Sequence, residues 1–270
     1  MQATETSPIA HPRVALGSVL VSLLEAVPGH EVALHRWYER DHFYAGCMLG
    51  PGFFAGRRFV ATRPLKDLRF PDKTPVIDDI DKGSFLALYW ILEGHHQETV
   101  DWAVQQVNWL NANDRMLPER VQAHAGFYHL RWTSGRDPDG VPSALALDHP
   151  FPAVALVMTD RAEGVTAPEF AQAYRGRIDT LSQGSPIALC LGLEPEPLPA
   201  DAPSYVIRPE GLERRSLQIF FLDEDPHAGW NTLFRDQQRW LREQGLGQIS
   251  YAAPFIPTVP GSDRFTDELW

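Results

Sequence analysis

The sequence predicts an α+β fold made of two βαββαβ units in one chain. Its 270 residues are enough for one large domain or two small ones. The order of elements expected in the first half recurs in the second half, which indicates an internal repeat. Several expected strands are apolar at every position, so both faces of each sheet should be buried.

The first unit is expected over residues 14–133. Apolar residues recur at helical spacing over residues 30–49, and Gly50-Pro51-Gly52 ends this helix. A second helix, with its apolar face between residues 100 and 110, separates the third and fourth strands. The expected strands cover residues 19–24, 53–62, 85–92 and 127–133.

The second unit is expected over residues 153–258. The sequence Thr166-Ala167-Pro168-Glu169 is a capping box with a proline in the first turn, and it predicts a helix start. Asp225-Pro226 predicts the start of the second helix. The expected strands cover residues 154–158, 187–193, 217–222 and 249–255.

Each unit therefore has the ferredoxin-like order, in which two helices cover one face of a four-stranded antiparallel sheet. The two open sheet faces can be buried only by packing sheet to sheet, so we expect a barrel-like pseudo-dimer within one chain. Residues 134–152, rich in Gly, Pro and Asp, form the expected linker. Residues 259–270 should form an extended strap that packs along the body or covers a pocket.

Composition limits the classes of partner. The chain has 24 Lys and Arg against 35 Asp and Glu, a formal net charge of −11, which disfavours nucleic acid and anionic membranes. Cys47 and Cys190 show no disulfide or zinc spacing, and no apolar run is long enough to span a membrane. Glu25 interrupts the apolar stretch at residues 14–27, which favours a strand over a targeting segment. We expect a cytoplasmic protein.

The first helix and the strand after it carry a family pattern. Residues 34–42 read LHRWYERDH, and they are followed by Gly50-Pro51-Gly52-Phe53 and Arg57-Arg58-Phe59. This pattern resembles the EthD-like branch of the dimeric α+β barrel superfamily, and the resemblance implies the barrel fold. Tyr44 stands where a proline often follows the family histidine. The second half keeps no such motif, so the first half is expected to hold the site.

The resemblance makes His42 the candidate general acid or base, with Tyr38 orienting a substrate oxygen. Trp37 would pack on the substrate. Arg57 and Arg58 alternate on a strand, so one of them faces a buried side and could stabilise negative charge there. The alternatives are a boundary role for His42 and a structural ion pair for the buried arginine. His35 is expected to be exposed to solvent.

The fourth expected strand adds further candidates. His129 and Arg131 should share one of its faces, and Trp132 should lie on the other face with Tyr128 and Leu130. These residues could line a substrate pocket. An edge strand with one wet face would explain them equally well.

We expect no metal and no other cofactor. His95 and His96 are adjacent at a helix start, where histidines are usually solvated, and His35 and His42 are too far apart along a helix to share an ion. Chlorite dismutases and coproheme decarboxylases also resemble two ferredoxin-like halves in one chain. They take their axial haem ligand from the second half, where this sequence offers only His227 at a helix start.

The sequence thus suggests a cofactor-independent enzyme that acts by proton transfer on a small apolar, aromatic or polyketide-like molecule. Isomerase, cyclase, dehydratase and lyase reactions fit this description. A cofactor-free monooxygenase of the same superfamily is one alternative, and a non-catalytic small-molecule-binding or stress-related protein is another. The chain could be a monomer, with the pseudo-dimer inside it, or a homodimer.

Overall fold

The computed structural model describes residues 14–204, 206, 208 and 210–270. The first half runs through β1 (Leu16–Ala26), α1 (Glu31–Trp37), β2 (Phe53–Val60), the short α2 (Arg63–Lys66), β3 (Phe85–Leu92), α3 (His96–Ala112) and β4 (Arg120–Gly135). The second half runs through β5 (Ala153–Arg161), α4 (Ala167–Ser182), β6 (Ile187–Glu196), β7 (Arg215–Leu222), α5 (Asp236–Glu243) and β8 (Gly247–Pro257).

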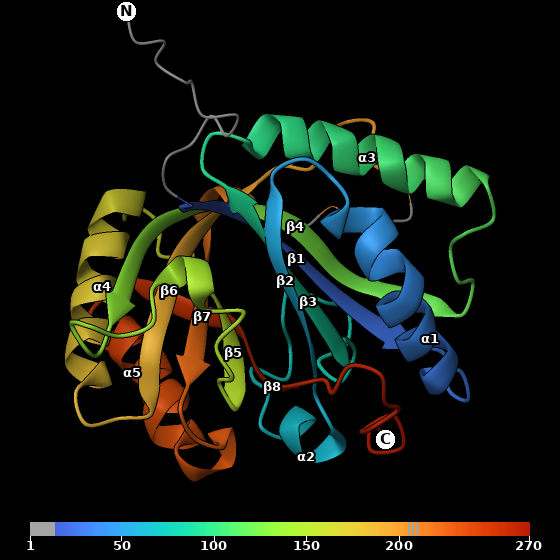
Figure 1. Cartoon of the computed structure of the whole chain (residues 1–270). Helices are drawn as coiled ribbons and strands as arrows, with labels where there is room; N and C mark the ends of the chain where they lie inside the picture. Colours follow the sequence, from blue (N-terminus) through green and yellow to red (C-terminus); the bar gives the residue numbers. More distant parts are fainter. Residues whose placement is uncertain (1–13, 205, 207, 209) are drawn as a thin grey trace, which may run out of the picture.

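The eight strands close into one barrel in the order β1-β3-β2-β8-β5-β7-β6-β4. Four neighbouring strands come from each half, and the helices of each half cover the outside of its own sheet (Figure 1). The predicted fold class, two ferredoxin-like units forming a single-chain α+β barrel, is therefore confirmed.

The two seams between the halves are unequal. Strands β4 and β6 pair over eight positions, from Phe127 opposite Glu196 to Gly135 opposite Leu189. Strands β2 and β8 pair only at Phe59–Pro257 and Val60–Ile256. The β4–β6 seam therefore supplies most of the backbone hydrogen bonding between the halves.

Large apolar side chains fill the barrel interior. Trp90, Tyr128, Phe221 and Phe255 are each almost fully buried there. The linker closes one end of the barrel, because its Ala146, Leu147 and Phe151 join the same core. Strand β4 continues to Gly135, two residues into the predicted linker.

The helix that was predicted over residues 30–49 is not one regular α-helix. It is α-helical only in α1, and it continues as π-helical turns over Tyr38–His42 and Tyr44–Met48. Such wide turns are rare in proteins and are frequent at functional sites. At α4 the predicted capping box is present, since the Thr166 and Glu169 side chains each accept a hydrogen bond from the other residue's backbone N–H.

Residues 259–270 pack along α1 through a series of turns and do not form an extended strap. The Ser262 carbonyl lies 2.8 Å from His35 Nε2, and Asp263 forms an ion pair with Arg36. Leu269 is completely buried against the first-half helix layer. His35 is therefore buried, with only 1 % exposure, and the expectation of an exposed histidine is wrong.

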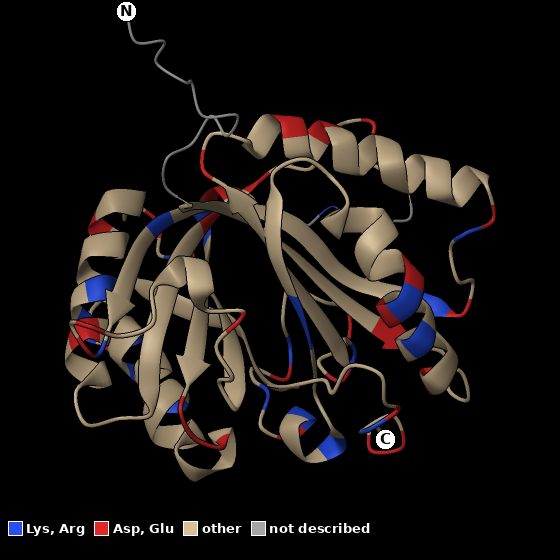
Figure 2. Ribbon diagram, in the orientation of Figure 1, with Lys and Arg blue, Asp and Glu red and all other residues tan. Residues whose placement is uncertain are grey.

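Charged residues lie mainly on the helices and loops, and the barrel strands are largely uncharged (Figure 2). Among the described residues, no helix has both the length and the apolar character needed to cross a membrane.

The packing of the C-terminal turns makes a stability prediction. Leu269→Ala should lower the free energy of unfolding by about 2–5 kcal/mol, the usual cost of a cavity at a fully buried leucine. Val259→Ala, in the same segment but 41 % exposed, is the matched control and should change it by less than about 1 kcal/mol. Urea unfolding measures both variants, and equal effects would contradict the described packing.

Candidate functional site

A cavity of about 100 Å³ lies between the first-half sheet and its helices. The sheet forms its floor, the π-helical turns after α1 form one wall, and α3 forms the other. The connection between β6 and β7, from the second half, covers it. Its lining residues are Leu20, Ser22, Leu24, Trp37, Tyr38, His42, Gly46, Cys47, Tyr89, Ala103, Val104, Val107, Met116, Arg120, Gln122, Ala125, Phe127, Leu198, Ala202, Pro203 and Val206.

His42 is the principal titratable group of the pocket. Its ring stacks on Trp37, with 4.6 Å between the centroids and 18° between the planes, and it meets Tyr38 edge-on at 5.2 Å. Burial lowers the pKa of His42 to about 4, and the positive charge of Arg120 acts in the same direction. The imidazole is therefore neutral at pH 7. Its Nδ1 atom is buried and has no hydrogen-bond partner in the described part of the chain.

Gly46 makes room for the His42 ring. A Cβ atom at this position would lie 2.8 Å from His42 Cε1, closer than real contacts allow. The two residues are four positions apart and belong to successive π-helical turns. The absence of a side chain at Gly46 therefore allows the His42 ring to occupy this position.

Tyr38 forms a buried pair with Tyr89, whose hydroxyl donates to the Tyr38 oxygen over 2.9 Å. Burial raises the pKa of both phenols, so both remain protonated at neutral pH. Burial also raises the pKa of the Cys47 thiol to about 12, which keeps this sulfur protonated and unreactive.

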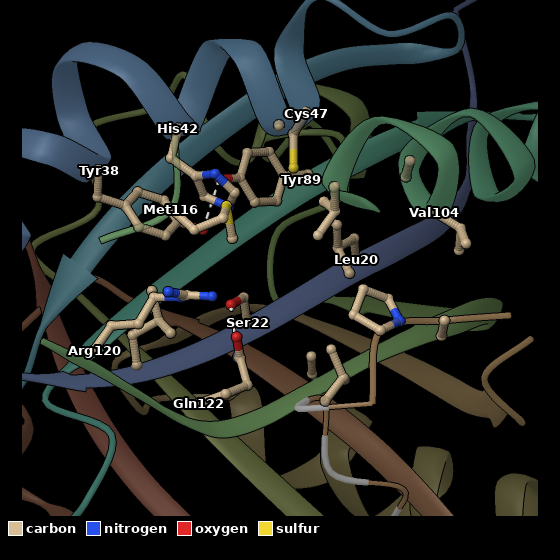
Figure 3. Close-up of a pocket in the computed structure, with 18 of the residues that line it drawn as sticks. Leu20, Ser22, Tyr38, His42, Cys47, Tyr89, Val104, Met116, Arg120 and Gln122 are labelled. Carbon is tan, nitrogen blue, oxygen red and sulfur yellow. Dashed lines mark hydrogen bonds between the residues drawn. The ribbon is translucent and has the colours of Figure 1, made fainter. Parts of the chain in front are cut away.

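Polar groups face His42 across the cavity. Figure 3 shows His42 and Tyr38 on one side, with Arg120, Ser22 and Gln122 on the opposite side. The Gln122 amide donates to Ser22 Oγ over 3.2 Å and to the His124 carbonyl over 2.7 Å. One side of an otherwise apolar cavity therefore presents a guanidinium, a hydroxyl and an amide.

The structure brings three of the predicted site residues together: Trp37, Tyr38 and His42 all line the cavity. The predicted arginines do not line it. The Arg58 guanidinium lies behind Tyr38, 4.9 Å from its ring centre, and donates to the His35 carbonyl. Arg57 donates to the Leu147 and His149 carbonyls of the linker. Backbone carbonyls therefore satisfy both guanidinium groups, where a carboxylate or an anionic ligand was expected.

The three candidates of the fourth strand also lie outside this cavity. Arg131 is paired with Glu194 at 2.8 Å, and His129 lies 2.7 Å from Glu196. Trp132 was expected on the face of Tyr128 and Leu130, which is wrong. A register shift between Leu130 and Trp132 breaks the alternation, and the indole packs with the outer core of the second half.

Four parts of the pocket lining were not predicted from the sequence: Arg120, Gln122, Tyr89 and the connection between β6 and β7. Arg120 and Gln122 were missed because β4 begins at Arg120, seven residues before the predicted start. The β6–β7 connection belongs to the second half, and no local sequence pattern predicts its contact with the first-half pocket. Residues 120–125 read RVQAHA, so polar and apolar side chains already alternate before residue 127. This alternation could have placed Arg120 and Gln122 on the strand.

In the second half, side chains occupy the space that corresponds to this cavity. Phe170, Tyr174, Trp230 and Phe234 fill the space between its sheet and its helices. His227, the only histidine that the second half offers as an axial ligand, is 45 % exposed and bonded to Asp225. These residues do not fit a haem group.

The sequence matches no protein-family model, and a search of curated proteins finds no relative. Solved structures do share the fold. An anthrone oxidase-like protein superimposes with a TM-score of 0.55 at 10% identity, covering 92% of this chain and 95% of its own. A candidate chlorite dismutase superimposes with a TM-score of 0.53 at 9% identity, covering 95% of this chain and 100% of its own. At such identities the likeness establishes the architecture: a dimeric α+β barrel with both ferredoxin-like halves in one chain.

Proposed function

We propose that the protein oxygenates a small, electron-rich aromatic molecule without a cofactor, and that His42 starts the reaction by removing a proton. The observation that carries this proposal is the neutral, buried imidazole of His42, which lines an apolar pocket opposite a guanidinium, a hydroxyl and an amide. A neutral imidazole with an unused lone pair is the form that can act as a general base.

The lining of the pocket supports an aromatic substrate. Apolar and aromatic side chains dominate it, and its volume of about 100 Å³ is of the order that encloses one ring. Additional rings would extend past Met116, Val107 and Leu198, which are only partly buried. The polar side formed by Arg120, Ser22 and Gln122 suits a hydroxyl or carbonyl oxygen on the substrate.

The pocket residues would divide the proton transfer between them. The neutral His42 imidazole accepts the proton, and the substrate is left as an anion. Arg120 offsets the negative charge in a poorly solvated site, where such compensation is strong. Because Tyr89 donates its proton to Tyr38, the Tyr38 hydroxyl keeps its own proton and would donate it to a substrate oxygen in place of its contact with Ser22.

The oxygenation needs only molecular oxygen as co-reactant. The substrate anion gives an electron to O₂, and recombination forms a carbon–oxygen bond. The peroxide takes the proton back from His42 and then loses water. A ring methylene thus becomes a ketone, with CH₂ and O₂ converted to C=O and H₂O, so O₂ is reduced and the ring carbon is oxidised.

Isomerisation, cyclisation, dehydration and elimination by a lyase begin with the same proton removal, so they form the second candidate class. The name of the anthrone oxidase-like fold neighbour agrees with oxygenation, and the EthD-like pattern around His42 agrees with either class. Oxygen consumption separates the two. Tight binding of a ligand that leaves unchanged would instead support the non-catalytic alternative.

The cellular compartment and the kind of partner that we propose follow from the composition of the chain. Cys47 and Cys190 are both buried free thiols, which agrees with a reducing, cytoplasmic compartment. The excess of acidic residues agrees with a small-molecule partner in place of nucleic acid or a membrane surface.

His42→Gln tests the proposal directly. With anthrone as the probe substrate, an oxygen electrode should record a turnover about 10²–10⁴-fold below that of the unmodified protein, because the base is lost. His227→Gln, an exposed histidine of the second half, is the matched control and should retain full turnover. Equal activity of the His42 variant would remove the proton-transfer role. Turnover of anthrone without oxygen uptake would favour isomerisation.

The pH dependence provides a second test. A base with a pKa of about 4 remains more than about 90 % unprotonated at pH 5.5, whereas a histidine at its ordinary value of about 6.5 would be about one tenth unprotonated. Between pH 8 and pH 5.5, kcat/KM should therefore change by less than about two-fold. Circular dichroism at each pH checks folding, because the pKa of buried His124 is also lowered to about 4 and protonation of either ring destabilises the fold. A tenfold decrease with midpoint near pH 6.5 would contradict this role of His42.

A further inference from the structure

A cluster of two histidines and one glutamate lies outside the pocket, at the seam of the two halves. His96 is the first residue of α3, His129 lies on β4, and Glu196 is the last residue of β6. His96 was predicted from the sequence to be a solvated histidine at a helix start. The fold instead places it against a strand of its own half and the end of a strand from the other half.

The three side chains converge on one point. His96 Nε2 lies 2.6 Å and His129 Nε2 lies 2.7 Å from the same carboxylate oxygen, Glu196 Oε2. The two imidazole rings are 4.1 Å apart, and one donor atom of each residue lies within 4.8 Å of the others. Donors around a tetrahedral zinc ion are about 3.3 Å apart. Small side-chain movements would therefore accommodate an ion.

A second group orients the cluster. The buried Ser18 hydroxyl lies 2.7 Å from His96 Nδ1, and Ser18 pairs with His129 across the β1–β4 ladder. A hydrogen bond at Nδ1 fixes the ring so that Nε2 is directed at Glu196. Histidines that bind metals usually have such a partner for their second nitrogen.

We propose that His96, His129 and Glu196 bind a divalent first-row transition metal ion such as Zn²⁺, which links the two halves of the barrel. Two imidazoles and one carboxylate suit this class of ion, whereas Mg²⁺ and Ca²⁺ prefer oxygen ligands throughout. The side chains are 17 %, 33 % and 32 % exposed, so an ion can enter and a water molecule can complete its coordination. This site shares no residue with the lining of the pocket.

The experiment uses the full chain and Zn²⁺ or Co²⁺ as the probe. Stripped protein should bind one equivalent of Zn²⁺ in equilibrium dialysis, and Co²⁺ at the same site should give visible absorption bands. Glu196→Gln and His129→Asn should each weaken Zn²⁺ binding by at least about tenfold, since each removes a ligand. Bound Zn²⁺ should also raise the melting temperature of the unmodified protein, because it binds the folded state.

Two neighbours serve as matched controls. His95→Asn changes the adjacent histidine, and Glu194→Gln changes a carboxylate two residues before Glu196; both should bind Zn²⁺ within about two-fold of the unmodified protein. His42→Gln should also bind normally, which separates this site from the proposed reaction. Absence of stoichiometric binding in the unmodified protein, or equal affinity in the Glu196 and His129 variants, would overturn the proposal. Circular dichroism confirms that each variant is folded.

Discussion

The burial of two apolar sheet faces against each other is the constraint on which the rest of this molecule depends. Each half has one sheet face covered by its own helices. The other face carries large apolar side chains such as Trp90 and Phe221, whose exposure to water would be unfavourable. Closing both sheets into one barrel removes these faces and the free strand edges together. Side chains of the described residues fill the barrel interior, and the cavity beside His42 lies outside the barrel, between the first-half sheet and its helices.

The two halves use that outer layer differently. In the second half, bulky aromatic side chains on α4 and around α5 pack between the sheet and the helices. In the first half, the π-helical turns and small residues such as Gly46 and Ala103 leave a cavity beside His42. Both halves thus keep the same fold, because each sheet needs helices to cover one face, but the packing between sheet and helices differs between them.

The seam between β4 and β6 joins residues of the two halves. It carries most of the backbone pairing between the halves, and it brings second-half residues to the first-half site. The connection after β6 covers the pocket, and Glu196 reaches the histidines of β4 and α3. Residues that are 67 and 100 positions apart in the chain therefore lie in contact. A single chain can build such mixed sites without symmetry, whereas a dimer of identical subunits would build each of them twice.

The sequence by itself determined the element order, the repeat, the apolar strands and the capping box at Thr166, since these depend on periodicity and on local hydrogen bonding. It also indicated Trp37, Tyr38 and His42, which lie close together in one helical segment. Only the tertiary structure decided that Arg57 and Arg58 turn away from the pocket, that Arg120 faces His42 and that His96 meets His129. These placements depend on how elements that are distant in the sequence pack against one another, and no local spacing encodes that packing.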